Sequence, residues 1–195
     1  HTGAPIFNTH GWWDIRRPTP LLGEHNDDVL QGDLGYSQED AGRIGKGDAT
    51  ERSAKSLPAA VSTRTGWDGE VKLPLDGIRV LDITLVFQGP YGTMFLADMG
   101  AEVIRVESLN VFPSTTRGII ARPTKEEQEA APTAMYPNRD PGPRPWNRFA
   151  MFNAHARNKR SMTVDISKPE GKEIFRKMVE VSDIFIENNA PGSVE

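Results

Sequence analysis

The first group of residues that could do chemistry is a short turn made of Val86, Phe87, Gln88 and Gly89, followed by Pro90. It stands between a run of branched apolar residues and a helical pattern, which is where open parallel sheets bind their ligands. Free backbone N–H groups at the start of a helix favour an anion such as a phosphate. The glycine spacing differs from the G-x-G-x-x-G pattern of nicotinamide and flavin sites. The turn therefore suits a phosphate-bearing ligand of another class, or it is an ordinary strand-to-helix turn.

A second group is the basic run of Arg157, Lys159 and Arg160. Three more arginines precede it, at positions 139, 144 and 148, and Asp140 is the one acidic residue between positions 139 and 160. Such a run would create a local positive field suited to a phosphorylated ligand. The alternative is a charged loop in solvent, which is the commoner outcome for a run of this kind.

A third group is the pair Asn188 and Asn189, which follows the last predicted strand. Asparagine side chains at this place bind the amides of a ligand or complete a turn of the chain. The residues by themselves favour the turn.

Several kinds of chemistry find no support in the sequence. There is no cysteine, so disulfides and thiolate catalysis are excluded. The four histidines have no metal-ligand spacing and no accompanying carboxylate cluster, so we predict no metal site. Neither a P-loop nor a G-x-S-x-G nucleophile elbow is present.

The charge and hydropathy patterns limit the kinds of partner that this chain could bind. The net charge of −4 comes without a basic excess in either half of the chain, so we expect no nucleic-acid partner. No run of eighteen apolar residues occurs, so we expect no membrane span. The chain opens with His1 and without a leader pattern, and we expect a soluble cytoplasmic protein cut from a longer one.

The elements that must position these residues follow from the apolar pattern. Residues 77–84 and 101–106 predict buried strands, and residues 91–99 between them predict a helix that ends at Gly100. Strand, helix and strand form a βαβ unit, so the two strands should be parallel with a right-handed crossover. A long irregular insert, residues 108–150, comes next and should be functional or mobile.

The pattern then resumes. Residues 161–166 and 183–187 predict two further strands, and the helix between them should begin with a capping box of Ser167 and Glu170. The apolar stripe of this helix is Ile174, Phe175, Met178 and Val179. The fold class is therefore α/β, a Rossmann-like parallel sheet with flanking helices, which we expect to be incomplete.

A different zone precedes this sheet. Residues 26–35 and 37–45 predict two short helices, the first after the N-cap residue Asn26 and the second after Ser37. Residues 47–72 are polar without a sustained period, as is typical of a linker.

Taken in order, the motifs of the sheet zone resemble the amino-terminal half of class III CoA transferases, the family of formyl-CoA transferase, carnitine-CoA transferase and α-methylacyl-CoA racemase. The similarity covers residues 73–107 and about 146–195. Its pieces are residues 75–82, 89–90, 96–107, 158–161, 165, 169–171, 182–188 and 191–192.

Residues 19–30 and 34–36 resemble the extreme carboxyl end of the same family. We therefore predict a junction in a tandem fusion. Residues 1–46 would be the tail of one transferase unit, 47–72 a linker, and 73–195 the CoA-binding half of the next unit. A circular permutation and an unrelated look-alike are the alternatives.

The resemblance implies where CoA lies, across the carboxyl ends of the strands. The residues predicted to bind it are Val86, Phe87, Gln88, Gly89, Lys159, Arg160, Val164, Asn188 and Asn189. Ser108 stands where the family commonly has a basic residue, and Arg144 or Arg148 could replace that contact.

The resemblance also implies the reaction, transfer of CoA between an acyl-CoA and a carboxylic acid through an aspartyl anhydride and thioester. The family's aspartate falls after the stretch matched by Gly192, so no catalytic residue is predicted in this chain, and Asp165 and Asp183 are interpreted as structural. An α-methylacyl-CoA racemase and a non-catalytic CoA-binding module remain the alternatives. We expect no tightly bound cofactor, and a partner chain that interlocks with this one as a homodimer, or else another segment of the same precursor.

Overall fold

The computed structural model describes residues 13–47, 73–109, 114–119, 124–130 and 133–192. The predicted linker lies outside these residues except for Gly47, and so do His1 and His10.

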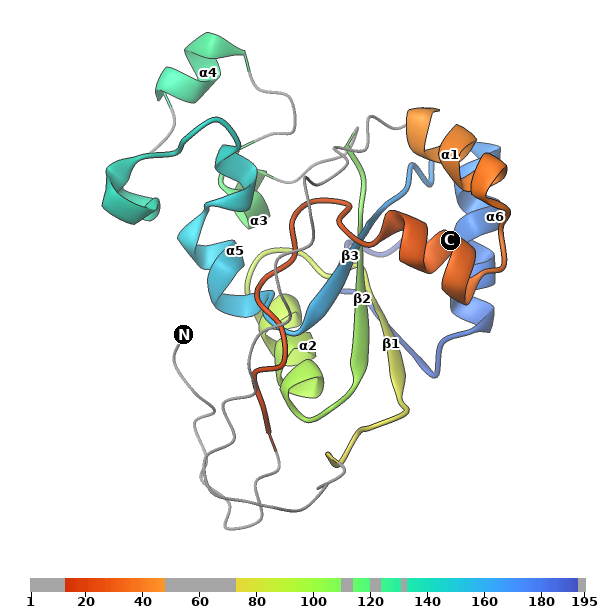
Figure 1. Ribbon diagram of the computed structural model, residues 1–195. Coiled ribbons are helices and arrows are strands. Elements are labelled where there is room, and N and C mark those ends of the chain that lie inside the picture. Colours follow the sequence, from red (N-terminus) through yellow and green to blue (C-terminus); the bar gives the residue numbers. More distant parts are fainter. Residues whose placement is uncertain (1–12, 48–72, 110–113, 120–123, 131–132, 193–195) are drawn as a thin grey trace.

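Four parallel strands form the centre of the structure, in the spatial order β3-β2-β1-β4. Figure 1 labels the first three of them side by side. The strands are β1 (Arg79–Asp82), β2 (Glu102–Glu107), β3 (Lys159–Thr163) and β4 (Ile184–Ile186). All four were predicted, and the βαβ unit of β1 and β2 is confirmed as parallel, with Val80 opposite Val103. The predicted α/β class with a parallel sheet and flanking helices is therefore correct.

The third strand was placed too late in the chain. It begins at Lys159, two residues before the predicted start, and it ends at Thr163. The prediction placed Lys159 and Arg160 just before the strand. Acidic partners within the fold neutralise these two side chains, as described below, and this allows the strand to include them.

Helix α2 (Gln88–Asp98) connects β1 to β2 and begins three residues before the predicted helix. Pro90 lies in its first turn, where a missing N–H removes no helical hydrogen bond. Gly100 follows the helix with a φ of 113°, a backbone conformation that side chains disfavour, so the predicted stop at this glycine is confirmed.

Helix α6 (Pro169–Glu180) connects β3 to β4, but the predicted capping box is wrong. Lys168 occupies the N-cap position and makes no side-chain cap. The Ser167 hydroxyl instead donates to the Asp165 carboxylate at 2.6 Å, because Asp165 lies two residues away at the end of the strand segment.

The insert between β2 and β3 contains several short helical segments in the part that the structure describes. They are α3 (Ser114–Arg117), α4 (Lys125–Ala130), three 3-10 turns (Thr133–Met135, Pro137–Arg139 and Pro145–Asn147) and α5 (Ala150–His155). The insert of residues 108–150, which the sequence predicted to be irregular, therefore contains several short helical segments. Its residues still lack a long element, as the many prolines predict.

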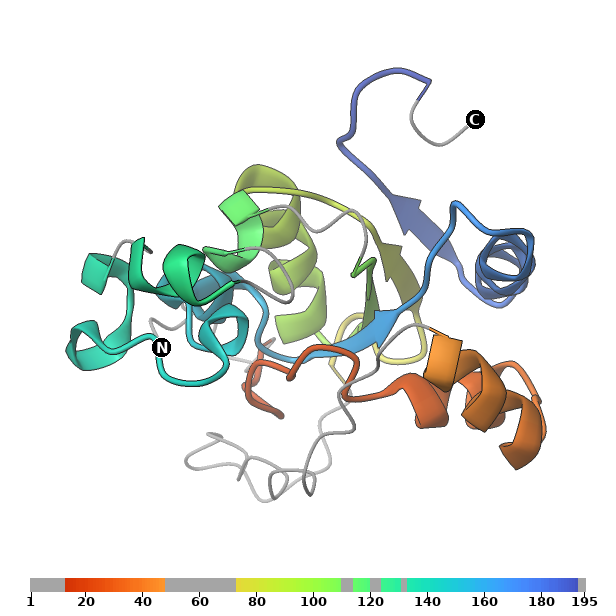
Figure 2. The ribbon, with the colours of Figure 1, turned by 90° about the horizontal axis from the view of Figure 1, so that it is seen from above.

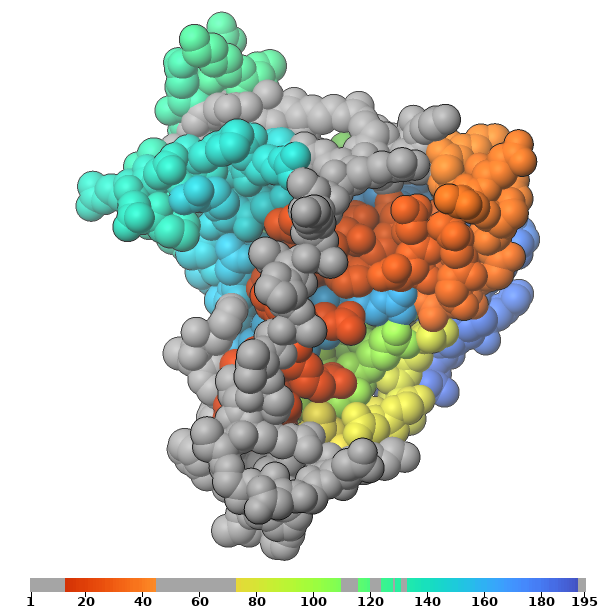
Figure 3. Space-filling model, in the orientation of Figure 1, coloured from red at the N-terminus to blue at the C-terminus, as the bar shows by residue number. Residues whose placement is uncertain are grey.

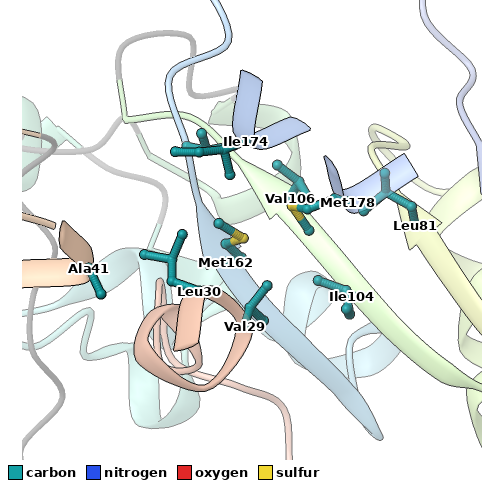
Figure 4. Packing of buried hydrophobic residues seen from close by; sticks show 10 residues of the cluster. Val29, Leu30, Ala41, Leu81, Ile104, Val106, Met162, Ile174 and Met178 are labelled. Atoms are coloured by element: carbon teal, nitrogen blue, oxygen red, sulfur yellow. The ribbon is translucent and has the colours of Figure 1, made fainter. Parts of the chain in front are cut away.

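Helices cover both faces of the sheet (Figures 1 and 2). Helix α6, the π-helical turn η1 (Asp28–Asp33) and α1 (Gln38–Gly47) cover one face, and α2 and α5 lie toward the other. The first face is the apolar core drawn in Figure 4. Its buried side chains are Val29, Leu30, Ala41, Leu81, Ile104, Val106, Met162, Val164, Ile174 and Met178.

The amino-terminal zone packs directly against this sheet. The His25 N–H donates to the Ser161 carbonyl at 3.0 Å, and the Thr163 N–H donates to the Asn26 side-chain oxygen at 2.9 Å. In Figures 2 and 3 this segment, residues 13–47 in red to orange, runs along β3 and continues to α1. The segment covers the outer edge of β3, which would otherwise present unpaired backbone groups. Residues 13–47 are therefore part of the same packed body as the sheet.

Candidate functional site

The predicted turn lies at the carboxyl edge of the sheet, between β1 and α2. Its apolar side chains are exposed, with 37% of Val86 and 48% of Phe87 accessible to solvent. Tyr91, one turn into α2, is 46% exposed. Exposed aromatic and branched side chains at a parallel-sheet edge are available to contact a ligand.

Two side chains from distant parts of the chain hold the backbone of this turn. The Asn188 side-chain oxygen accepts the Leu85 N–H at 2.7 Å, and the Asn188 side-chain nitrogen donates to the Leu85 carbonyl at 3.1 Å. The Thr116 hydroxyl oxygen accepts the Val86 N–H at 3.1 Å. Val86 has a φ of 65°, so its backbone is held in a conformation that a branched residue rarely adopts.

Gly89 is needed for the close approach of α2 to the strand. A Cβ atom at this position would lie 2.5 Å from the Cβ of Thr84, which is inside van der Waals contact. Thr84 cannot easily move, because its N–H and hydroxyl both donate to the buried Asp82 carboxylate, at 2.9 and 2.5 Å. The glycine therefore has a packing role at the start of the helix.

Backbone donors at the turn give it anion-binding capacity. The first N–H groups of a helix have no acceptor inside the helix, and in α2 these belong to Gln88 and Gly89. The positive end of the helix dipole points in the same direction. The turn thus combines exposed apolar side chains with donors suited to a phosphate or a carbonyl oxygen.

Lys159 lies beneath this helix and not in an open groove. Its ammonium is fully buried and donates to Asp82 at 2.9 Å, to the Pro90 carbonyl at 2.8 Å and to the Thr93 hydroxyl at 2.7 Å. Burial by itself would raise the pKa of Asp82, but Lys159 and Arg105 outweigh burial and lower that pKa to about 2. Lys159 therefore contributes to the site as a support for α2, which corrects its predicted place among ligand contacts.

Arg160 lies toward the amino end of the sheet, away from the turn. It forms ion pairs with Asp33 at 2.7 Å and with Glu102, and Arg79 contacts the same two carboxylates. Arg157 likewise pairs with Asp98 at 2.7 Å within the protein. The basic run is neither the solvated loop nor the open positive field that the sequence suggested.

A hollow of about 730 Å³ lies at the amino end of the strands, between the amino-terminal segment (residues 13–47) and the sheet. Three arginines and three carboxylates are among its lining residues, so these charges balance. Burial, together with Arg17 and Arg160, lowers the pKa of His25 in its wall to about 4 and keeps that ring neutral. None of the residues of the turn lines this hollow, and we place the candidate site at the turn because the exposed apolar side chains and the first N–H groups of α2 are there.

The structure therefore brings part of the predicted set together. Val86, Phe87, Gln88, Gly89 and Asn188 lie at one place, and Asn189 follows directly with its N–H bonded to Glu187 at 2.6 Å.

Val164 is buried in the apolar core at 3% exposure, so its side chain does not line a groove. Sequence reasoning missed Thr116, Asp82 and Thr93, all of which act on the turn or its helix. Asp82 and Thr93 carried a signal, since each is a polar residue inside an apolar pattern. Thr116 carried none, because its contact joins residues thirty positions apart, across α2, β2 and the start of the insert.

With the geometry established, comparison with known proteins identifies the class. The family described as CoA-transferase family III matches residues 75–195, and the chain belongs to this family.

The relatives carry related names. The succinyl-CoA–L-malate CoA-transferase alpha subunit of Chloroflexus aurantiacus is 34% identical over 139 residues, which are 71% of this chain and 27% of the relative. The succinyl-CoA:glutarate CoA-transferase of Mus musculus is 35% identical over 121 residues, 62% of this chain and 23% of the relative. The formyl-CoA:oxalate CoA-transferase of Rhodopseudomonas palustris (strain BisA53) is 36% identical, again over 62% and 23%.

A solved structure of a CAIB/BAIF family protein from Brucella suis matches with a TM-score of 0.47 and 30% identity, over 64% of this chain and 28% of that one. The chain spans about a quarter of the length of the curated relatives it matches. Among the described residues, no helix is both long and apolar enough to span a bilayer.

Proposed function

We propose that this chain supplies part of the CoA-binding half of an enzyme that moves CoA between an acyl-CoA and a free carboxylic acid. The observation that carries the proposal is the exposed turn of Val86, Phe87 and Gln88 at the carboxyl edge of a family III sheet. The names of the three relatives, all CoA-transferases, favour transfer over racemisation and over a non-catalytic module.

In the proposed binding mode, CoA lies across the turn and contacts it mainly through the backbone. Phe87 and Val86 offer apolar surface to the adenosine or pantetheine portion. The N–H groups of Gln88 and Gly89 offer donors to an oxygen of the ligand. Asn189 borders the same edge, and Asn188 contributes through the contacts it makes with Leu85.

The proposed reaction uses an enzyme aspartate that is not among these residues. Its carboxylate attacks the thioester carbonyl of the acyl-CoA. The C–S bond breaks, CoA thiolate departs, and a mixed anhydride of the aspartate and the acyl group forms. The thiolate then attacks the aspartyl carbonyl and releases the first carboxylic acid. The acceptor carboxylate then attacks the aspartyl thioester, so that CoA thiolate departs and a second mixed anhydride forms. The thiolate attacks the acyl carbonyl of this anhydride, which restores the aspartate and forms the new acyl-CoA.

Two organisational features complete the proposal. The chain is a junction, in which residues 1–46 derive from the end of one unit, residues 47–72 link the units and residues 73–195 begin the next. The rest of the catalytic domain comes from an interlocked partner chain or from another segment of the same precursor. Mass measurement of the native protein by light scattering, alone and with CoA, tests the second feature.

A pair of glycine variants tests the binding site. Gly89→Ala places a methyl group 2.5 Å from the Thr84 Cβ and must shift the start of α2. We expect this variant to weaken CoA binding at least tenfold, because the misplaced N–H donors would lose about 1.4 kcal/mol or more of binding free energy. Isothermal titration calorimetry on the native protein measures the affinity.

Gly92→Ala is the matched control, because Gly92 lies in the same helix and a Cβ atom there would meet nothing within 4 Å outside the nearby backbone of that helix. It should bind CoA like the parent protein. The proposal fails if the parent protein shows no CoA binding, or if both glycine variants bind equally well with unchanged helix content by circular dichroism.

A further inference from the structure

We infer that Asn188 and Thr116 are positioning residues, which set the path of the turn that carries the proposed CoA contacts. The inference rests on the proposed function, since it concerns the same turn. It assigns to Asn188 a role different from that of a ligand contact, and it gives Thr116 a role that the sequence did not indicate.

The Asn188 side chain joins the end of β4 to the turn through both ends of its amide. Its oxygen lies 2.7 Å from the Leu85 nitrogen, and its nitrogen lies 3.1 Å from the Leu85 oxygen. A pair of opposed hydrogen bonds to a single residue fixes the orientation of both of its peptide groups, which one bond alone would leave free to rotate. Asn188 is exposed, so this arrangement does not depend on a rigid core around it.

Thr116 holds the next residue of the chain, Val86. Its side chain is 1% exposed, and its hydroxyl oxygen accepts the Val86 N–H at 3.1 Å. Val86 has a φ of 65°, so the backbone there would relax without an outside contact. The two side chains thus bind consecutive N–H groups of the turn.

The next donors along the chain are those of Phe87, Gln88 and Gly89. Because the N–H groups of Leu85 and Val86 already have acceptors, a ligand must bind to the later ones. The Asp82–Lys159 pair fixes the far end of the turn through the Pro90 carbonyl. The turn is therefore held at both ends and left open in the middle.

Variants of the native full-length chain test the inference in two ways. Asn188→Ala and Thr116→Val should each weaken CoA binding by about tenfold, the loss expected from one or two hydrogen bonds that orient the site. Thr116→Ser retains the hydroxyl and should restore binding to within about twofold of the parent. Ser182→Ala is the control, since it removes another side-chain-to-backbone hydrogen bond, to the Met178 carbonyl at 2.6 Å, just after α6 on the other face of the sheet.

Amide hydrogen exchange on the ligand-free protein supplies the readout that general destabilisation would not mimic. Exchange at Leu85 should speed up at least tenfold in Asn188→Ala, and at Val86 in Thr116→Val, with the amides of β2 unchanged. If exchange at these amides stays at the parent rate, or if the variants bind CoA as the parent does, the positioning role is wrong. If the parent binds no CoA, the proposed function fails first and the inference fails with it.

Discussion

Both faces of the sheet are buried, but their chemistry differs. Toward α6 and η1 the strands present Leu81, Ile104 and Met162, each at most 1% exposed. Toward α2 and α5 the same strands present Asp82, Arg105 and Lys159, also at most 1% exposed, beside a smaller apolar cluster against α2. One face is an apolar core, and the other, the charged face, combines apolar contacts with a network of charges removed from water.

Ion pairs between its side chains offset the cost of burying charges on the charged face. Glu107 accepts two bonds from Arg117, and Arg105 lies 3.4 Å from the same carboxylate. Burial would raise the pKa of Glu107, but the two arginines lower it to about 2 and keep the carboxylate ionised. The Arg117 guanidinium also stacks 3.6 Å above the ring centroid of Phe152. The apolar face therefore gains stability from each buried side chain, whereas the charged face depends on every partner being present.

Removing one charge from the network of the charged face should have the largest effect on stability. Lys159→Met leaves Asp82 buried without its closest cation, and we expect a loss of about 3–5 kcal/mol of unfolding free energy. Urea denaturation followed by circular dichroism measures this loss.

The control is the double variant Asp82→Asn with Lys159→Met, which removes both charges. It should be more stable than Lys159→Met alone, because no unpaired carboxylate remains. Equal stability of the single and double variants would mean that the ion pair does not govern this face.

On the apolar face, Leu30→Ala tests both the core and the place of the amino-terminal segment. Leu30 is 1% exposed and packs with Met162 in the same cluster. We expect a loss of about 3 kcal/mol, within the usual range for a buried leucine. Gln38→Ala on the exposed side of α1 is the control and should change stability by less than about 0.5 kcal/mol. A negligible effect of Leu30→Ala would mean that the segment does not belong to this folding unit.

The smallest effect concerns the pH dependence of the charged face. Burial, aided by Lys159 and Arg105 and opposed by Asp82, lowers the pKa of His155 from 6.5 to about 3. Below pH 6.5 the unfolded chain binds a proton that the folded chain refuses, so stability is present above pH 6.5 and is lost as pH falls toward 3. Between pH 7 and pH 5 this single group should remove about 2 kcal/mol.

His155→Gln should flatten that part of the profile, measured by urea denaturation at each pH. His25→Gln offers a comparison, because the pKa of His25 is also lowered, to about 4, and it lies at the edge of β3 instead of beneath the sheet. A pH profile of His155→Gln with the parent slope would show that His155 is not held neutral by the charged face.

Much of the fold was predictable because it depends on local patterns. Branched apolar runs identified all four strands, and Gly100 marked the end of α2. The capping box at Ser167 failed because Asp165 competes for the same hydroxyl through a closer contact. The start of β3 was missed because charged residues are typical of loops, and the acidic partners that allow them in a buried strand are distant in the sequence.

For the candidate site, the sequence located the turn but not what holds it. Val86 to Gly89 were identified from the strand-to-helix boundary, which is a local feature. Lys159 was assigned to the ligand because its charge was visible and its partner Asp82, seventy-seven residues away in sequence, was not. Distance along the chain gives no measure of which charges meet in space.

The class of fold, the family and the position of the candidate turn could be predicted from the sequence, because apolar periodicity and ordered motifs are properties of neighbouring residues. The folded structure was needed to show that Asn188 and Thr116 hold that turn, that the basic run is neutralised inside the protein, and that residues 13–47 cover the edge of β3. These depend on which side chains come within bonding distance when distant strands pair, since a buried charge or donor is stable only beside its partner.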